Sequence, residues 1–357
     1  MAFPFAFSAI AIALAIIAPT AISAQTKLVT FVFGDSLTDV GNNNFLPLSL
    51  AKSNYPWYGI DYLPRVPTGR FTNGRTIGDI ISAKLGIEPP PPYLSLSLDD
   101  DEILHGVNYA SGGAGILNET GIYFVEKLSF DDQITCFQKT AEAIRKKIGN
   151  VASKKLLNEA VYFIGLGSND YVNNFLQPFL VDAHIYTYDQ FLSLLISTLD
   201  GQLKRLYSLG ARRVVFDGLG PMGCIPSQRI HAPDGGCLEL LNKWALHFNT
   251  RVKSLLTYHN YQLPGALFSF SDNYNIVLDL IQNPQKYGFK ISTTSCCNVD
   301  TTVGGLCLPN SKLCDNRHEY VFWDAYHPTD AANQVIADLL FASPSFNQSS
   351  ALSFLQH

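Results

Sequence analysis

Charged residues are scarce in this chain of 357 residues: Asp, Glu, Lys and Arg make up 15% of it, against 47% hydrophobic residues. The formal net charge of -5 leaves no excess of basic residues, so we expect no nucleic-acid partner. This composition is not that of a disordered chain. No Gly/Ser linker, charge block or internal repeat divides the sequence, and we therefore expect a single domain over residues 25–357.

Metal-binding spacings are also missing. The sequence has no Cys-x-x-Cys pair, and His318-Glu319 lacks the second histidine of a His-Glu-x-x-His zinc helix. We therefore expect no metal and no organic cofactor, and interpret six histidines as structural or surface residues: His105, His184, His231, His247, His259 and His318. The one metal alternative left open is a zinc site formed by Cys296, Cys307, Cys314 and His318.

The first segment, residues 2–24, contains no charged side chain and ends in the small residues Ala21, Ser23 and Ala24. This pattern is typical of a secretory signal peptide, cleaved after Ser23 or Ala24. A retained membrane anchor is the alternative, but Pro19 and the small residues favour cleavage. The chain does not end in a Lys-Asp-Glu-Leu type of retention signal. We expect a secreted protein with no stable membrane span after cleavage.

Seven cysteines in a secreted chain predict disulfides, and an odd number leaves at least one thiol unpaired. Cys136 lies in a predicted helix and is the candidate for the free thiol. Cys224 with Cys237 is one plausible pair. Two further bridges are plausible among the last four cysteines, with the connectivity open: Cys296, Cys297, Cys307 and Cys314.

Two Asn-x-Ser/Thr sequons accompany the predicted leader. They begin at Asn118 and Asn347, and the second lies near the C-terminal end. In a secreted protein both are accessible to N-glycosylation. We predict a glycoprotein, and favour Asn118 over Asn347.

Apolar strand-like runs alternate with segments of helical periodicity. The runs are continuous rather than alternating, which is typical of strands buried on both faces in a parallel sheet. The predicted strands are Thr30 to Phe33, Val161 to Gly165, Arg213 to Asp217 and Ala266 to Phe270. The predicted helices are Ile77 to Leu85, Asp131 to Lys147, Tyr188 to Leu209, Leu238 to Tyr258 and Thr329 to Phe341. This order predicts a doubly wound α/β/α sandwich, with ligands at the carboxyl ends of the strands.

A serine and a histidine–aspartate pair carry the main chemical signal. Ser36 follows the first predicted strand in Gly34-Asp35-Ser36-Leu37, and far along the chain Asp324-Ala325-Tyr326-His327 supplies a carboxylate and an imidazole. Nucleophilic acyl transfer needs a serine to attack, a histidine to take its proton and an acid to orient the histidine. The three together predict a serine hydrolase, whereas Ser36 alone would more often be a turn residue or a helix cap.

Two further segments offer donors for an oxyanion. Asn108 to Gly115 is rich in glycine, so its backbone N–H groups can approach a ligand closely, and Asn169 carries a side-chain amide at the end of another predicted strand. The neighbouring Asp35 and Asp170 are interpreted as hydrogen-bonding loop residues rather than acids or bases. Aromatic residues near Tyr55, Trp57 and Tyr58, and from Tyr171 to Phe179, are more typical of core packing than of an acyl pocket.

Together these blocks resemble the ordered blocks of the GDSL esterase/lipase family, in the plant-type secreted branch of the SGNH hydrolases. The resemblance is carried by Phe33 to Asn43, Asn108 to Gly115, Gly165 to Tyr171 and Asp324 to Pro328. Segment 210–226 and Cys296-Cys297 also fit that branch, so the resemblance covers nearly the whole mature chain. No Gly-x-Ser-x-Gly elbow surrounds Ser36, which argues against the α/β-hydrolase fold.

The resemblance implies a mainly parallel, flavodoxin-like α/β/α sandwich in which Ser36 is the nucleophile, His327 the general base and Asp324 its orienting acid. It implies an oxyanion hole formed by the backbone N–H of Ser36, the backbone N–H of Gly113 and the side-chain amide of Asn169. Gly112 is the alternative to Gly113, because adjacent glycines leave the alignment uncertain by one residue.

The function expected from these residues is hydrolysis of a carboxylic ester through an acyl-serine intermediate. Transfer of the acyl group to an alcohol by the same triad, and a catalytically silent binding protein, are the alternatives. The sequence does not separate lipid, cell-wall and small-metabolite esters. Secretion in this branch fits the apoplast or cell wall.

Overall fold

The computed structural model describes residues 28–299 and 305–342. Its central sheet has five parallel strands in the order β2-β1-β3-β4-β5. The strands are β1 (Thr30–Gly34), β2 (Gly106–Asn108), β3 (Val161–Gly165), β4 (Arg213–Asp217) and β5 (Leu267–Ser271). Four of them confirm the predicted strands. β2 is not predicted by the sequence pattern, because it is a three-residue edge strand without an apolar run of its own.

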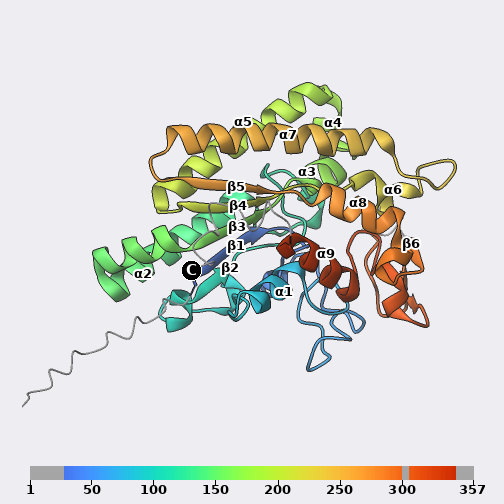
Figure 1. The fold of residues 1–357 in the computed structure, drawn as a ribbon, viewed down its shortest axis with the longest axis horizontal. Helices are drawn as coiled ribbons and strands as arrows, with labels where there is room; N and C mark the ends of the chain where they lie inside the picture. Colours follow the sequence, from blue (N-terminus) through green and yellow to red (C-terminus); the bar gives the residue numbers. More distant parts are fainter. Residues whose placement is uncertain (1–27, 300–304, 343–357) are drawn as a thin grey trace, which may run out of the picture.

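Helices cover both faces of the sheet (Figure 1). One face packs against α2 (Phe130–Glu159), α5 (Tyr188–Leu209) and α7 (Glu239–Gln262). The other packs against α1 (Ile77–Lys84) and α9 (Asp330–Ala342). The three-layer α/β/α sandwich with a parallel sheet is therefore confirmed. The five predicted helices are also confirmed, except that α2 runs on past Lys147 to Glu159.

The helix boundaries follow local chemistry. Thr76, Ser129 and Thr187 each close a capping box at the start of α1, α2 and α5, as expected of polar residues at helix starts. The predicted end of α2 at Lys147 is too early, because Gly149 interrupts the helical pattern. Gly149 has φ of 79°, a left-handed conformation that breaks the helical backbone, and a second helical stretch continues beyond it.

Shorter elements surround the carboxyl edge of the sheet. The helices among them are α3 (Ser168–Asp170), α4 (Asp182–Ile185), α6 (Pro226–Arg229) and α8 (Tyr274–Gln282). The strands are β6 (Ile291–Ser295) paired with β9 (Tyr320–Phe322), and β7 (Cys297–Asn298) paired with β8 (Lys312–Leu313). They bring the C-terminal loop between β9 and α9 towards the end of β1.

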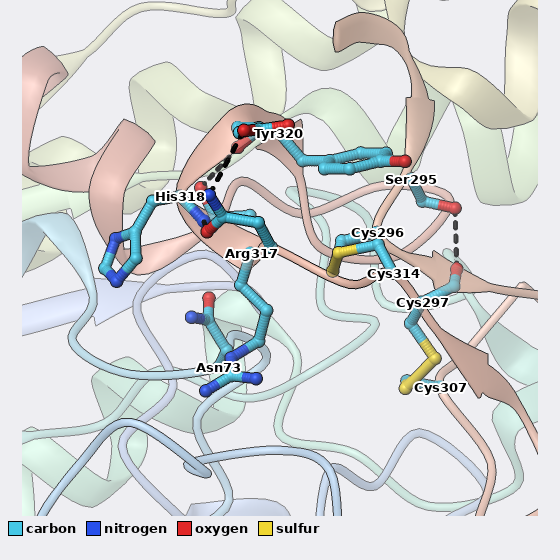
Figure 2. Close-up of a disulfide and its surroundings, with 12 residues drawn as sticks. Asn73, Ser295, Cys296, Cys297, Cys307, Cys314, Arg317, His318 and Tyr320 are labelled. Carbon is cyan, nitrogen blue, oxygen red and sulfur yellow. Dashed lines mark hydrogen bonds between the residues drawn. A yellow bond between two sulfur atoms is a disulfide. The ribbon is translucent and has the colours of Figure 1, made fainter. Parts of the chain in front are cut away.

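Three disulfides form within the described residues: Cys224–Cys237, Cys296–Cys314 and Cys297–Cys307. The last two lie side by side (Figure 2). Cys136, buried in α2, takes part in none of them. The expected pairs and the free thiol are confirmed. The zinc alternative is wrong, because the sulfur atoms of Cys296, Cys307 and Cys314 are all in disulfides.

Candidate active site

The candidate residues meet at the carboxyl edge of the sheet. Ser36 lies two residues beyond β1, and Asn169 lies in α3, just beyond the neighbouring strand β3. The chain leaves β1 for β2 on one side and reaches β3 on the other, so the order of the strands reverses between β1 and β3. Ligands of open α/β sheets bind at such a reversal.

Ser36, His327 and Asp324 form a continuous chain of hydrogen bonds. His327 Nε2 lies 2.8 Å from Ser36 Oγ, and His327 Nδ1 lies 2.8 and 2.9 Å from the two carboxylate oxygens of Asp324. Asp324 and His327 are buried, whereas Ser36 is partly exposed. Both buried residues come from the short loop between β9 and α9, so a spacing of three residues brings carboxylate and imidazole together. This geometry allows His327 to accept a proton from Ser36.

Tyr58 completes the surroundings of Asp324, a role that its place in the sequence does not predict. Its hydroxyl donates to Asp324 Oδ2 at 2.7 Å and accepts from the backbone N–H of Cys307 at 3.0 Å. Asp324 Oδ1 also accepts from the backbone N–H groups of Tyr326 and His327. The sequence favours core packing for Tyr58, which is buried, and does not predict this hydrogen bond. No sequence signal joins two residues 266 positions apart.

Gly113 and Asn169 line the same cavity as Ser36 and His327. Gly113 has φ of 80°, and a Cβ there would lie 2.5 Å from the Phe124 ring, so only glycine fits. The N–H of Gly112 is donated to Asp39. This bond favours Gly113 over Gly112 as the donor to a ligand.

The amide of Asn169 is held in place from both ends. Its Nδ2 donates to the carbonyl of Ala114 at 2.8 Å, and its Oδ1 accepts from Asn173. An amide nitrogen has two hydrogens, so one remains for a ligand.

Buried aspartates tie the loops around Ser36 together. Asp39 accepts from backbone N–H groups of Gly41, Asn42 and Gly112, which joins the loop after β1 to the glycine-rich segment. Removal from water raises the pKa of Asp39 to about 6, although these hydrogen bonds oppose the increase. We interpret Asp39 as a structural residue that holds these two segments together.

Asp35 and Asp170 are the hydrogen-bonding loop residues that the sequence predicted. Asp35 accepts from the N–H of Leu37 and the hydroxyl of Ser168, and Asp170 accepts from two backbone N–H groups and from Thr120. Burial raises the pKa of both carboxyls to about 6. Asp170 thereby links the Asn169 loop to the segment that carries Gly113.

The other residues named in the sequence analysis lie outside this site. Five of the six histidines named above are exposed, and His259 is buried beside Asp200, which confirms their interpretation as structural or surface residues. Among the described residues, no group of three or more His, Cys, Asp and Glu could hold a metal ion.

No helix in the described part of the chain is long and apolar enough to cross a membrane. Asn118 is exposed, and Asn347 lies outside the described residues.

A three-layer α/β/α fold with a hydrogen-bonded serine, histidine and aspartate at the carboxyl edge of its sheet has the architecture of an acyl hydrolase. The family model described as GDSL-like lipase/acylhydrolase matches residues 30–340, and the chain belongs to this family. It is accordingly a hydrolase of carboxylic esters.

Relatives in Arabidopsis thaliana support the assignment over most of the chain. One GDSL esterase/lipase is 64% identical over 336 residues, which cover 93% of this chain and 94% of the relative. A second is 48% identical over 316 residues, which cover 88% of this chain and 86% of the relative.

Two solved structures are more distant. One is of a carbohydrate esterase, with a TM-score of 0.39 and 13% identity, covering 88% of this chain and 67% of that one. The other is of phospholipase A1 from Streptomyces albidoflavus, with a TM-score of 0.36 and 14% identity, covering 91% of this chain and 100% of that one. Both scores lie below 0.5, so these likenesses contribute nothing to the assignment.

Proposed function

We propose that the protein hydrolyses its ester through an acyl intermediate on Ser36. His327 takes the proton of the Ser36 hydroxyl as Oγ bonds to the ester carbonyl carbon. The protonated His327 then gives this proton to the departing alcohol as the carbon–oxygen bond breaks. Water, deprotonated by His327, attacks the acyl-serine, and the proton returns to Ser36 as the acid leaves. The observation that carries this proposal is the 2.8 Å contact between His327 Nε2 and Ser36 Oγ.

In this mechanism the remaining residues stabilise charge. Asp324 orients the imidazole and stabilises its protonated form. The N–H groups of Ser36 and Gly113 and the amide of Asn169 hold the negative oxygen of the tetrahedral intermediate, where loss of one donor typically costs about 100- to 1,000-fold in rate. A single catalytic domain over residues 25–357 and a cofactor-free reaction are part of the proposal.

Labelling with a serine-directed phosphonate tests the nucleophile. We expect one phosphonate per protein, attached to the peptide that contains Ser36, because among the hydroxyls of residues 28–299 and 305–342 only this one has an imidazole as a proton acceptor. Peptide mass mapping locates the adduct, and heat-denatured protein is the control that should not react. An adduct on another residue, with Ser36 unmodified, would contradict the proposal.

We further propose that the protein is secreted to the apoplast or cell wall and glycosylated at Asn118 and Asn347. The three disulfides fit an oxidising compartment, and the exposure of Asn118 leaves room for a glycan. The leader at residues 1–24 lies outside the described residues.

N-terminal sequencing of protein from a plant expression host tests secretion, and the mature chain should start at Ala24 or Gln25. Glycosidase treatment tests the glycan, and it should lower the mass of the wild type more than that of Asn118→Gln. A mature chain that starts at Met1 would contradict secretion.

A further inference from the structure

The two faces of the central sheet carry side chains of very different size. Residues that pair across neighbouring parallel strands share a face, and successive residues alternate between faces. The face towards α2, α5 and α7 carries Phe31, Phe33, Tyr162, Ile164, Phe216, Phe268 and Phe270. The face towards α1 and α9 carries Thr30, Val32, Val161, Gly165, Val215, Asp217, Ser269 and Ser271, and its larger side chains are Phe163 and, at the starts of β4 and β5, Arg213 and Leu267. Large side chains fill the first interface, and small ones leave space in the second.

This space belongs to the cavity that begins at Ser36. The cavity has a volume of about 250 Å³ and is lined by Ser36 and His327 at one end. From there it follows β1 past Val32 to Thr30, the first residue of the strand. Four residue steps separate Gly34 from Thr30, so this part of the cavity is about 13 Å long at a rise of ~3.3 Å per residue.

Helices α1 and α9 form the opposite wall and run in the same direction. Thr76, before α1, and Asn333, in the first turn of α9, border a small cleft with Ser36, so both helices start at the active site. Ser82 and Leu340, further along these helices, also line the cavity. They therefore lie at its far end, away from Ser36.

Gly165, the last residue of β3, has no side chain to fill the cavity. A Cβ built on it meets nothing closer than the Asp217 side chain at 3.7 Å, so any larger side chain there would project into the space beside Asp217. Both residues line the cavity. Gly165 pairs with Gly34, two residues before Ser36, so a residue without a side chain lies near the start of the cavity.

The cavity is poor in charge. Among the described residues that line it there is no lysine, arginine or glutamate, and its carboxyl groups are Asp35 and Asp217. Burial raises the pKa of Asp217 to about 7 and that of Asp35 to about 6, because removal from water disfavours the charged carboxylate. A sugar or an anionic group would leave hydrogen bonds unmade here, whereas a hydrocarbon chain needs none and gains free energy on leaving water.

We propose that this cavity is the acyl-binding subsite, and that the preferred substrates are esters of linear, medium- to long-chain fatty acids. This inference rests on the proposed function, because it places the carbonyl carbon at Ser36. The chain then lies between the small side chains of β1, β3 and β4 and the helices α1 and α9, with its methyl end towards Thr30 and Ser82. The fit of a straight chain along one strand disfavours branched acyl groups.

Hydrolysis of 4-nitrophenyl esters from acetate to palmitate tests the subsite. The value of kcat/KM is expected to rise about four-fold for each methylene added, from ~0.8 kcal/mol per buried CH₂, until the chain fills the cavity. In Ser82→Phe the added ring occupies the far end, and the ratio of kcat/KM for dodecanoate to that for butyrate should fall at least ten-fold. Ala83→Phe is the matched control, because Ala83 is the exposed neighbour of Ser82 on the same helix. An unchanged ratio in folded Ser82→Phe would overturn the inference.

A binding measurement separates this inference from the proposed mechanism. In Ser36→Ala protein, titration calorimetry with methyl esters from hexanoate to dodecanoate should show affinity that increases with each methylene. Adding Ser82→Phe, or Ser82→Leu if the larger side chain prevents folding, should weaken dodecanoate binding at least ten-fold. Binding that depends on chain length but no turnover by the wild type would overturn the mechanism and keep the subsite. Turnover or binding that ignores chain length would overturn the subsite alone.

Discussion

Replacement of Ser36 by alanine is expected to lower kcat by about 10⁵- to 10⁶-fold, the scale seen when a catalytic serine is removed from a triad. The variant keeps the Cβ and loses only the oxygen that lies 2.8 Å from His327 Nε2. Ser36 is partly exposed at the end of β1, so the loss of one hydroxyl leaves the core intact. Steady-state kinetics on a 4-nitrophenyl ester and a thermal unfolding curve measure both effects.

Ser168→Ala is the matched control for this experiment. Ser168 also follows a strand and lines the same cavity, but its hydroxyl donates to Asp35 at 3.1 Å rather than to an imidazole. We expect it to retain at least a tenth of the wild-type kcat. Substantial turnover by pure Ser36→Ala, or loss of turnover in Ser168→Ala alone, would show that Ser36 is not the nucleophile.

The fold was predictable because its strands are buried on both faces. Val161 to Gly165 and Arg213 to Asp217 were placed to the residue, since continuous apolar runs bounded by turns leave little choice. β2 escaped because Gly106–Asn108 pairs only at the edge of the sheet and contains one apolar residue. Whether such a short edge segment forms a strand depends on its pairing with the neighbouring strand, and its own sequence pattern does not reveal it.

The candidate site was predictable as far as its residues lie in motifs. Ser36, Asp324 and His327 stand in recognisable segments, and the structure brings them into hydrogen-bond contact. The bond from Tyr58 to Asp324 was not predictable, because it depends on how two distant loops pack around the Cys297–Cys307 disulfide. The long cavity was not predictable either, because it results from residue size compared across two faces of a sheet that must first be assembled.

Replacement of Asp324 by asparagine is expected to lower kcat by about 10⁴-fold with a small change in KM, as expected when a triad histidine is held in the wrong tautomer. The carboxylate of Asp324 accepts from His327 Nδ1, from the Tyr58 hydroxyl and from two backbone N–H groups. An asparagine amide has only one oxygen to meet these donors, and its NH₂ group faces others. The imidazole then places its proton on Nε2, where it can no longer accept the proton of Ser36.

Two further variants, Tyr58→Phe and Asp315→Asn, distinguish this effect on kcat from a general loss of packing. Tyr58→Phe keeps the carboxylate and removes one donor to it, so we expect kcat to fall only about ten-fold, in line with ~1.5 kcal/mol for a hydrogen bond to a charged group. Asp315→Asn makes the same chemical change on an exposed residue and should match the wild type. If Asp324→Asn costs no more than Tyr58→Phe, then Asp324 serves to hold the loop between β9 and α9, and His327 works without an orienting acid. If the costs separate as expected, the negative charge of Asp324 is what makes His327 a base.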